Sequence, residues 1–441
     1  MFAFGRNLLR LIFALSFATA ISGAESGNRV LAILEDEALK VSHKEFLSSV
    51  VEAGFEVTTG LSRDGSLRLK EWDEWLFDHL IILAPRAIEF SRAFGVKDVL
   101  EFVDSGRNVL FTGDVGFSSK IGELAQECGV DLDGEDTQVL DHLNFAQGSG
   151  DAGLPDDDSA LIAADTSPTD AITGGFDSGA PVLFRGVAAT LPPDTELAVP
   201  ALLAPSTSYS SGQKEKLSSV KDPAIGRDIS LVTLVQARNN ARVSIFGSLE
   251  MLSDAFFNAK FKVWASGVSH DAPANREFCF KTAMWTFQRR GVLVVEDDRI
   301  KHWEMSSKAT PEMYRINDDI HFEIGVSEQR DGKKIPFKAD DVQLEYTMMD
   351  PHIRTNLLPS KEGGVLSADF KAPDVYGVFK FVMEYRKPGY SYIDIVRQAP
   401  IRPFRHNEFG RFLVSAYPYY VSCFSIMIGF FVLGFFFLYH K

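Results

Sequence analysis

The fold is decided by three short apolar runs, RVLAILE at 29–35, HLIILAP at 79–85 and NVLFTGD at 108–114. None of the three alternates between apolar and polar residues. Segments with helical periodicity accompany them, at 42–53, 96–104 and 119–127. Continuous apolar strands separated by amphipathic helices are typical of a parallel sheet covered on both faces. We therefore predict a Rossmann-like α/β fold for this part of the chain.

Weaker elements continue the α/β pattern. FEVTTGL at 55–61 predicts another strand, and the segment at 72–76 predicts a short helix. Residues 131–179 are rich in Asp, Gly, Ser and Pro, a composition typical of surface loops. We expect these acidic loops to surround a short strand at 161–164 and to be inserted into the α/β fold.

A hairpin and two closing elements follow the insertion. Asn239 and Asn240 lie between two apolar runs and tolerate the positive φ of a tight hairpin. A helix at 275–289 and the strand GVLVVED at 291–297 then close the α/β region. The predicted α/β domain covers residues 25–298.

The periodicity changes to two after about residue 303. Alternating runs without intervening helices predict a small antiparallel β-sandwich. These runs are HFEIGV at 321–326, DVQLEYTM at 341–348, GVFKFVMEY at 377–385 and YSYIDIV at 390–396. Turn residues separate them at Asp331-Gly332 and at 387–389. The predicted β-rich domain covers 299–405, and a stalk follows at 406–413.

The N-terminus has the pattern of a secretory signal peptide. Arg6 and Arg10 are followed by an apolar core at 11–20 and by the small residues Ser22-Gly23-Ala24. The alternative is an uncleaved anchor, but the core is short for a hydrocarbon layer of about 30 Å. We predict cleavage of residues 1–24 and translocation of the chain that follows.

The C-terminus has the pattern of a membrane anchor. No charged residue occurs from 412 to 439, and a helix at 414–439 is long enough to cross the bilayer at about 1.5 Å per residue. Tyrosines favour the headgroup depth, and glycines let a neighbouring helix approach closely. The predicted membrane and assembly residues are Tyr417, Tyr419, Tyr420, Gly429 and Gly434. Residues 440–441 form the cytosolic tail of a type I single-pass protein.

Charge and cysteine content exclude several classes of protein. The net charge is −15, and loss of two arginines with the signal leaves −17, which argues against a nucleic-acid or anionic-lipid surface. Cys423 falls in the membrane helix. Cys128 and Cys279 form either one disulfide or two unpaired buried thiols, and a disulfide scaffold is excluded.

Ligand sites in open α/β sheets lie beyond the carboxyl ends of the strands. Glu35, Asp36 and Asp114 occupy such ends and are candidates to bind a cation or a sugar; the alternative is that they begin helices or fill turns. GxGxxG does not follow the first strand, and GxxxxGK[ST], HExxH and CxxC are absent. We predict no catalytic, cofactor-binding or metal-binding residues and no cofactor.

Five longer segments carry a family resemblance. They are PVLFRGV at 181–187, LVQARNNARV at 234–243, GSLEMLSDAFFN at 247–258, PDVYGVF at 373–379 and RFLVSAYPYY at 411–420. Through these segments and their order, the chain resembles the 48 kDa subunit family of the oligosaccharyltransferase complex. The resemblance implies a lumenal domain like the class I glutamine amidotransferases without their nucleophile, then a β-rich domain and an anchor.

The resemblance also implies the function. It is that of a non-catalytic subunit of the endoplasmic-reticulum enzyme that moves a preassembled oligosaccharide from dolichyl diphosphate to Asn in Asn-x-Ser/Thr. The implied partners are a multispanning catalytic subunit, ribophorin-like subunits and small membrane subunits. The short tail lacks a dilysine signal, so retention would depend on assembly.

Two other functions remain open from the residues alone. One is a lumenal sugar-binding or hydrolase-like module that acts through Glu35, Asp36 and Asp114. The other is a single-pass receptor at the cell surface, which would have to leave the endoplasmic reticulum.

Overall fold

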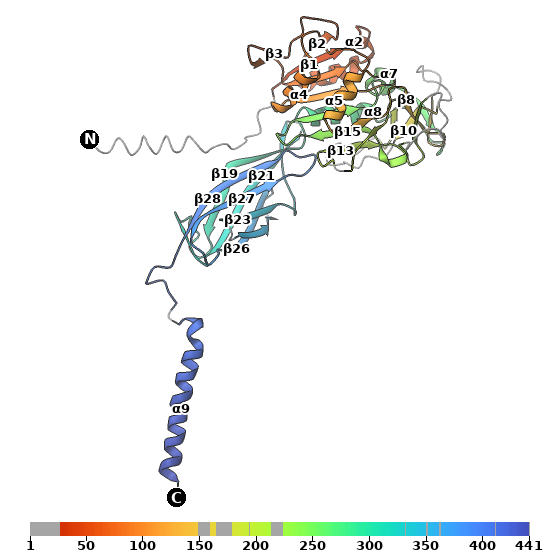
Figure 1. Cartoon of the computed structure of the whole chain (residues 1–441). Helices are drawn as coiled ribbons and strands as arrows, with labels where there is room; N and C mark the ends of the chain where they lie inside the picture. The colour runs from red at the N-terminus through yellow and green to blue at the C-terminus, as the bar shows by residue number, and fades with distance from the viewer. Residues whose placement is uncertain are drawn as a thin grey trace, which may run out of the picture.

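The computed structural model describes residues 27–148, 159–164, 179–193, 195–212, 224–330, 332–349, 352–360, 363–410 and 412–440. The predicted signal peptide at 1–24 lies outside these residues, as do Asp331, Arg411 and Lys441. The described chain is a mixed α/β protein with several β-sheets and one apolar C-terminal helix (Figure 1).

The main sheet has nine strands in the order β2-β1-β5-β6-β16-β15-β12-β7, with β13 paired to β15. Its first five strands are parallel, and the predicted apolar runs form three of them. Their bounds are β2 Glu56–Leu61, β1 Arg29–Leu34, β5 His79–Leu83, β6 Asn108–Thr112 and β16 Arg242–Phe246. Because both faces of β5 and β6 are buried, these strands need no polar face.

Helices cover both faces of the main sheet. Alternate residues of β1 show this division, because Val30, Ala32 and Leu34 join one core while Leu31 and Ile33 join the other. The first core contains apolar side chains of α3 (Lys44–Glu52) and α8 (Asn275–Thr286). The second contains those of α4 (Val96–Asp104) and α5 (Ser119–Glu127), which have the predicted bounds. A single turn, α2 (Leu39–Ser42), precedes α3.

The cysteines lie on different sides of this sheet. Cys279 belongs to the first core and Cys128 packs against the second, so the sheet separates their sulfurs. Both are free thiols, as is Cys423. Of the two alternatives left by the sequence, the structure selects unpaired thiols.

The helix predicted at 72–76 is wrong. Strands β3 (Lys70–Glu71) and β4 (Glu74–Trp75) form a hairpin there instead. Trp72 and Asp73 link them with φ of 49° and 71°. Two successive left-handed residues make the tight turn whose twist suits a hairpin, and they interrupt a helix.

The hairpin predicted at Asn239 and Asn240 is confirmed. Strands β15 (Ile229–Gln236) and β16 are antiparallel, and Asn240 has a φ of 68° between them. The predicted strand at 161–164 is present as β10 (Ile162–Ala164), which pairs with β11 (Val182–Phe184) outside the main sheet.

The segment between α5 and β15, together with β17 and β18 after β16, forms small sheets and also adds strands to the main sheet. The pairs β10-β11 and β14-β8 and the three-stranded β18-β17-β9 lie outside it, whereas β7, β12 and β13 extend it. The remaining bounds are β7 Asp131–Leu132, β8 Thr137–Leu140, β9 Ala146–Gly148, β12 Ala189–Thr190, β13 Ala198–Leu203, β14 Tyr209–Gly212, α7 Asp254–Phe257, β17 Phe261–Val263 and β18 Ser269–His270.

Two five-stranded sheets pack face to face as a β-sandwich. One contains β19 (Val292–Glu304), β21 (Asp319–Arg330), β22 (Lys333–Pro336), β25 (Leu358–Pro359) and β26 (Val365–Lys371). The other contains β20 (Tyr314–Arg315), β23 (Gln343–Thr347), β24 (His352–Asn356), β27 (Gly377–Tyr385) and β28 (Ile393–Arg402). Alternate residues such as Phe322 and Phe381 fill the core between the sheets, as their period of two requires.

The strand GVLVVED does not close the α/β region as predicted. It begins β19, which pairs with β21 of the sandwich at Val292–Val295 and again from Ile300. A register shift between these two parts lets the long strand bend. Strand β19 therefore crosses the predicted boundary between residues 298 and 299.

The C-terminal helix α9 (Tyr417–Tyr439) follows a 3-10 turn at Val414–Ala416. The most apolar 18-residue window within Val414–Tyr439 has a mean hydropathy of 2.4 and contains no buried residue. Figure 1 shows the helix and the α/β region beyond opposite ends of the sandwich.

Candidate functional site

Arg86 brings two of the predicted strand-end acids together. It follows β5, and its Nη2 donates to Asp114 Oδ2 at 3.0 Å. Its backbone N–H donates to Glu35 Oε2 at 3.4 Å, and its Nε donates to the Val115 carbonyl at 3.2 Å. The carboxyl ends of neighbouring parallel strands therefore meet around an arginine that the sequence analysis did not select.

The three predicted acids are not equivalent. Asp114 is largely buried, and desolvation raises its pKa, although hydrogen bonding from Val115 and the charge of Arg86 oppose the shift. Asp36 is exposed and accepts a hydrogen bond from the Glu37 N–H at 2.7 Å, so it fills a turn. The structure thus groups Glu35 with Asp114 and leaves Asp36 in the alternative role.

A second ion pair at this end of the sheet was missed by the sequence analysis. Arg185 follows β11, and its Nε and Nη2 donate to the two carboxylate oxygens of Glu250 at 2.6 and 2.8 Å. Bidentate geometry is the strongest form of this pair. Glu250 and Arg185 also act on the pKa of Asp114. The pair joins PVLFRGV to GSLEMLSDAFFN, two segments on which the resemblance rests.

The chemistry available at these strand ends is limited. Asp114 and Glu250 each hold an arginine, and Glu35 accepts from the Arg86 N–H. Among the described residues, no group of three or more His, Cys, Asp or Glu is arranged to hold a metal ion. Two open grooves of about 590 Å³ lie elsewhere, between α3 and α8 and beside Cys128. The strand ends are therefore an ion-paired surface.

A buried arginine organises the junction between the α/β region and the sandwich. Arg242 begins β16 and is fully buried. Its guanidinium donates to the carbonyls of Trp285 and Arg290, both at 2.7 Å, and of Gly291 at 2.9 Å. These carbonyls lie at the end of α8 and in the connection to β19. One side chain therefore fixes the segment that joins the two parts.

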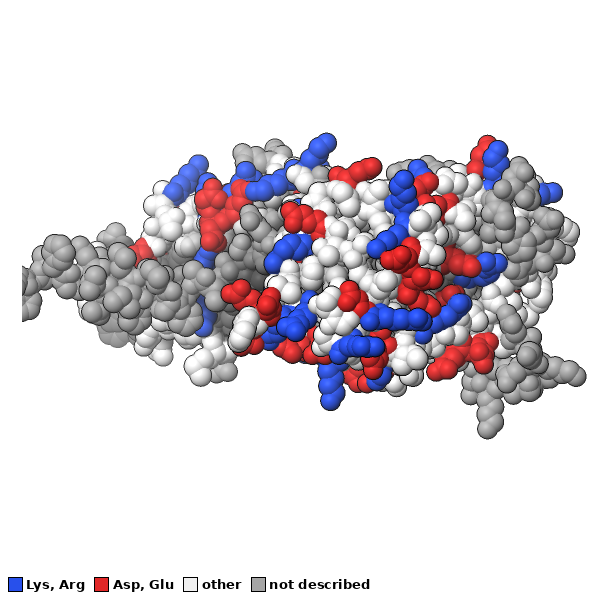
Figure 2. Space-filling model, turned by 90° about the horizontal axis from the view of Figure 1, so that it is seen from above, with Lys and Arg blue, Asp and Glu red and all other residues white. Residues whose placement is uncertain are grey.

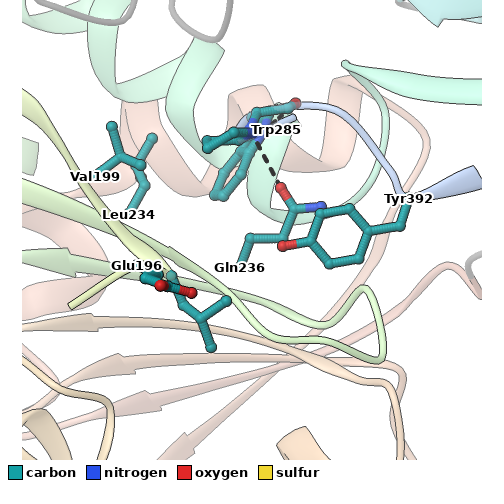
Figure 3. Close-up of a pocket in the computed structure, with 9 residues that line it drawn as sticks. Glu196, Val199, Leu234, Gln236, Trp285 and Tyr392 are labelled. Carbon is teal, nitrogen blue, oxygen red and sulfur yellow. Dashed lines mark hydrogen bonds between the residues drawn. The ribbon is translucent and has the colours of Figure 1, made fainter. Parts of the chain in front are cut away.

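The turn between β27 and β28 docks against the same place (Figure 3). Trp285 Nε1 donates to the Gly389 carbonyl at 2.8 Å. The Gln236 side chain accepts from the Gly389 N–H at 3.2 Å and donates to the Tyr390 carbonyl at 2.6 Å. The cavity beside these residues is about 10 Å³, the room that one water molecule needs. The junction is a packed contact with no room for a larger ligand.

The predicted membrane residues lie on α9 and at its start. Tyr417, Tyr419 and Tyr420 are exposed in its first turn. Among the described residues, no atom outside the adjacent helix backbone would lie within 4 Å of a Cβ at Gly429 or Gly434. Five residues on an α-helix place these glycines about 140° apart around the axis. The two notches therefore face different directions, and one straight partner helix cannot fill both.

Two family models cover almost the whole chain. The model described as the OST48 N-terminal domain matches residues 21–289, and the one described as the OST48 middle domain matches 302–441. The chain belongs to the OST48 family. The boundary between the two matches falls at β19, where the structure passes from the main sheet to the sandwich.

Relatives in this family match over nearly their full length. One relative is the Arabidopsis thaliana protein named dolichyl-diphosphooligosaccharide–protein glycosyltransferase 48 kDa subunit. It is 39% identical to this chain, and the match covers 98% of this chain and 97% of the relative. The protein of that name is 34% identical in Danio rerio, covering 99% and 97%. It is 36% identical in Drosophila melanogaster, covering 98% and 95%.

One solved structure that the chain matches is a ThuA-like protein of Parabacteroides merdae. It is 12% identical, with a TM-score of 0.31, and the match covers 59% of this chain and 89% of that protein.

Surface charge is mixed on the face of the α/β region turned away from α9. Figure 2 shows Lys and Arg side chains interspersed with Asp and Glu over that face. The α/β region also contains paired charges, as in Lys70 with Glu101 and Lys120 with Glu123. Interspersed charges produce no extended field of one sign, so this face offers no basic track for a polyanion.

Proposed function

We propose that the chain is a non-catalytic subunit of the oligosaccharyltransferase complex. In this role it supports transfer of a preassembled oligosaccharide from dolichyl diphosphate to Asn in Asn-x-Ser/Thr of nascent proteins. The single observation that carries the proposal is the match, at 34–39% identity and over 95–97% of their length, to relatives named as the 48 kDa subunit. The ion-paired strand ends agree with a supporting role.

We further propose a type I orientation in the membrane of the endoplasmic reticulum. The apolar span at Val414–Tyr439 supports a single anchor, and the signal pattern at 1–24 supports a lumenal location for the rest. The proposed lumenal parts are an α/β domain that begins at about residue 25 and a β-rich domain that ends near residue 405. Since β19 belongs to the sandwich, the dividing point moves from 298 to about 291.

The α/β domain is proposed to have the fold of the class I glutamine amidotransferases without their nucleophile. Its parallel order β2-β1-β5-β6, with helices on both faces, supports this assignment. No cysteine follows the described strands of this parallel set, since Cys128 ends α5 and Cys279 lies within α8. Burial raises the pKa of Cys128 to about 12, which leaves a poor nucleophile.

Helix α9 is proposed as an assembly element. The tyrosines in its first turn would lie among the lumenal headgroups, and its two glycines would each receive a different membrane neighbour. The multispanning catalytic subunit, ribophorin-like subunits and small membrane subunits are the proposed partners. Retention would then follow from assembly.

Depletion of the chain tests the proposal. Secreted glycoproteins should lose occupancy at Asn-x-Ser/Thr sites, and re-expression of the full chain should restore it. In mild detergent the chain should co-purify with a multispanning subunit in a large assembly. Normal site occupancy after complete depletion would contradict the proposed role.

The sugar-binding or hydrolase-like alternative gains little support from the geometry. It requires free carboxylates at the strand ends, whereas Asp114 pairs with Arg86 and Asp36 caps its own turn. An Asn-x-Ser/Thr acceptor introduced into the chain distinguishes a cell-surface receptor from the subunit and from the sugar-binding module. Golgi-type glycans on that acceptor would show that the chain leaves the endoplasmic reticulum.

A further inference from the structure

Several loops converge at the end of the sandwich opposite the α/β region. The pairing of Glu304 with Ile320 and of Asp319 with Lys371 places three strand ends together. The Ala372 N–H donates to the Asp318 carbonyl at 2.8 Å, and Gly377 pairs with Ile401 near the end of β28. The loops at 305–313 and 372–376 therefore lie where the chain leaves the sandwich for α9.

A third loop reaches the same end. Thr347 pairs with Lys380, so the turn after β23 extends towards Gly377. A Cβ on Gly377 would lie 2.3 Å from Met348 Sδ, which shows that the two loops touch. We call residues 305–313, 348–349 and 372–376 the sandwich tip.

Large apolar side chains project from each loop of the sandwich tip. Their exposed fractions are 48% for Met313, 97% for Met349, 41% for Val375 and 65% for Tyr376. None of them lines either of the open grooves described above. Single exposed apolar residues are ordinary, whereas several on adjoining loops at one end of a domain are typical of a surface that contacts a membrane or another protein.

The segment after β28 folds back onto the sandwich tip. Arg402 donates through Nη1 and Nη2 to both carboxylate oxygens of Glu408, at 2.6 and 2.8 Å. The guanidinium of Arg315 lies 5.4 Å from the centre of the Phe404 ring, and that ring lies 5.5 Å from Phe409. Because Arg315 is two residues from Met313, residues 403–409 are tied to the tip and do not form a free tether.

A short linker therefore separates the sandwich tip from the membrane helix. Only residues 410–413 lie between Phe409 and the 3-10 turn at Val414–Ala416. From Phe409 to Val414 an extended chain advances at most about 3.6 Å per residue, or about 18 Å in all. The headgroup layer on one side of a bilayer is about 5–8 Å thick, so a tip held by this linker stays beside the lipid surface.

We propose that the sandwich tip rests on the lipid surface, with Met313, Met349, Val375 and Tyr376 at the depth of the headgroups. The proposal rests on the membrane span of α9. The occupant is a bilayer because the linker keeps the tip beside one, and because the side chains project from separate loops. Arg315 and Arg402 at this end are paired with Asp318 and Glu408. The tip loops also carry the acids Glu312 and Asp374 beside Lys308, so their charge is mixed and the contact suits zwitterionic lipids.

Site-specific fluorescence measures this contact in the full chain. A chain with Cys128→Ser and Cys423→Ser receives an environment-sensitive label at Met313→Cys or at Tyr376→Cys. It is reconstituted into phosphatidylcholine nanodiscs, with or without lipids that carry a nitroxide quencher near the headgroup. Trp72→Cys is the matched control, because Trp72 is 94% exposed on the β3-β4 hairpin of the α/β region, which lies beyond the other end of the sandwich from α9 (Figure 1).

The expected result is several-fold stronger quenching by lipid at 313 and 376 than at 72, with weaker quenching by aqueous iodide. Equal iodide quenching at all three positions would overturn the proposal. Protection from iodide without lipid quenching would also overturn it, since a protein surface would then cover the tip. In a separate experiment, a label on native Cys423 alone is probed with acyl-chain nitroxides. Its quenching tests whether α9 spans the membrane, independently of the sandwich tip.

Discussion

The guanidinium of Arg242 lies 4.7 Å from the centre of the Trp285 ring and donates to the carbonyl of the same residue at 2.7 Å. One residue is on the main sheet and the other is in the last turn of α8. Together they form a platform against which the connection to β19 and the turn at 387–392 pack. The position of the sandwich relative to the α/β region therefore depends on a buried cation and an indole.

Replacing Arg242 by Ala should destabilise the protein by about 3–5 kcal/mol. The change removes the donor of three carbonyls and leaves a buried cavity. Urea unfolding of the full chain in detergent, followed by tryptophan fluorescence, measures the loss. Arg238→Ala, four residues earlier and exposed, is the control and should cost under about 0.5 kcal/mol.

Gly291→Ala should damage the junction more than a matched glycine substitution elsewhere. Gly291 has a φ of 63°, and a Cβ there would lie 2.4 Å from the Gly389 carbonyl oxygen. Gly332 has a φ of 77° with no atom within 4 Å. Backbone strain alone costs about 1–2 kcal/mol in Gly332→Ala, and the steric clash should roughly double that cost in Gly291→Ala. Equal losses in the two variants would contradict the close approach.

Gln236→Ala should loosen the docking turn without unfolding either part. Its side chain bonds the Gly389 N–H and the Tyr390 carbonyl, so amide hydrogen exchange should accelerate in peptides that contain 387–392. Asn239→Ala on the same hairpin removes bonds to the carbonyls of Val103 and Asp104 instead. That control should leave exchange at 387–392 unchanged.

His79 should make stability fall as the pH drops. Burial lowers its pKa to about 4, and its ring bonds the Gly27 carbonyl and the Asn108 side chain. In the unfolded chain His79 takes up a proton near pH 6.5. The stabilisation from neutral, buried His79 is therefore complete above pH 6.5 and is lost progressively towards pH 4. The loss between pH 7.5 and 5.0 should be about 2 kcal/mol.

His79→Gln supplies the test of this pH dependence. The variant loses stability at pH 7.5 through packing, but its free energy of unfolding should change less between pH 7.5 and 5.0. Burial also lowers the pKa of His43. His43 therefore makes stability fall with decreasing pH in both the native protein and the His79→Gln variant. Parallel pH profiles for the two proteins would rule out His79 as the source.

The combined change Glu35→Ala, Asp36→Ala and Asp114→Ala should leave glycosylation unchanged. Loss of the Arg86–Asp114 pair costs at most about 1 kcal/mol, because Arg86 is more than half exposed. Site occupancy of a secreted reporter in depleted cells measures the outcome. Lost occupancy in a variant that still co-purifies with the complex would instead favour the sugar-binding or hydrolase-like function.

Local pattern was sufficient for elements that are buried along their whole length. The runs at 29–35, 79–85 and 108–114 became β1, β5 and β6 because continuous apolar sequence is tolerated only with both faces covered. Helices α4 and α5 have the predicted bounds, since their apolar stripes recur at the helical period. The ladder of β27 also has its predicted bounds, because alternation fixes which face is buried.

Short elements and pairing partners were not predictable in this way. Trp72, Trp75 and Leu76 recur at helical spacing, and only the left-handed φ of Trp72 and Asp73 makes the segment a hairpin. GVLVVED has the composition of a strand in either sheet, and its hydrogen bonds to β21 decide between them. At the strand ends, Arg86 was overlooked because its partner Asp114 follows a different strand.

The sequence by itself determined the long buried strands, the apolar C-terminal helix and the family that the chain resembles, because apolar periodicity and length are properties of neighbouring residues. Only the tertiary structure decided that Gln236 meets Gly389, that Arg242 holds the connection to β19, and that four apolar side chains share the sandwich tip. These contacts join residues tens to more than one hundred positions apart. Their partners are set by sheet order and by the bonding of buried polar groups, which no local period encodes.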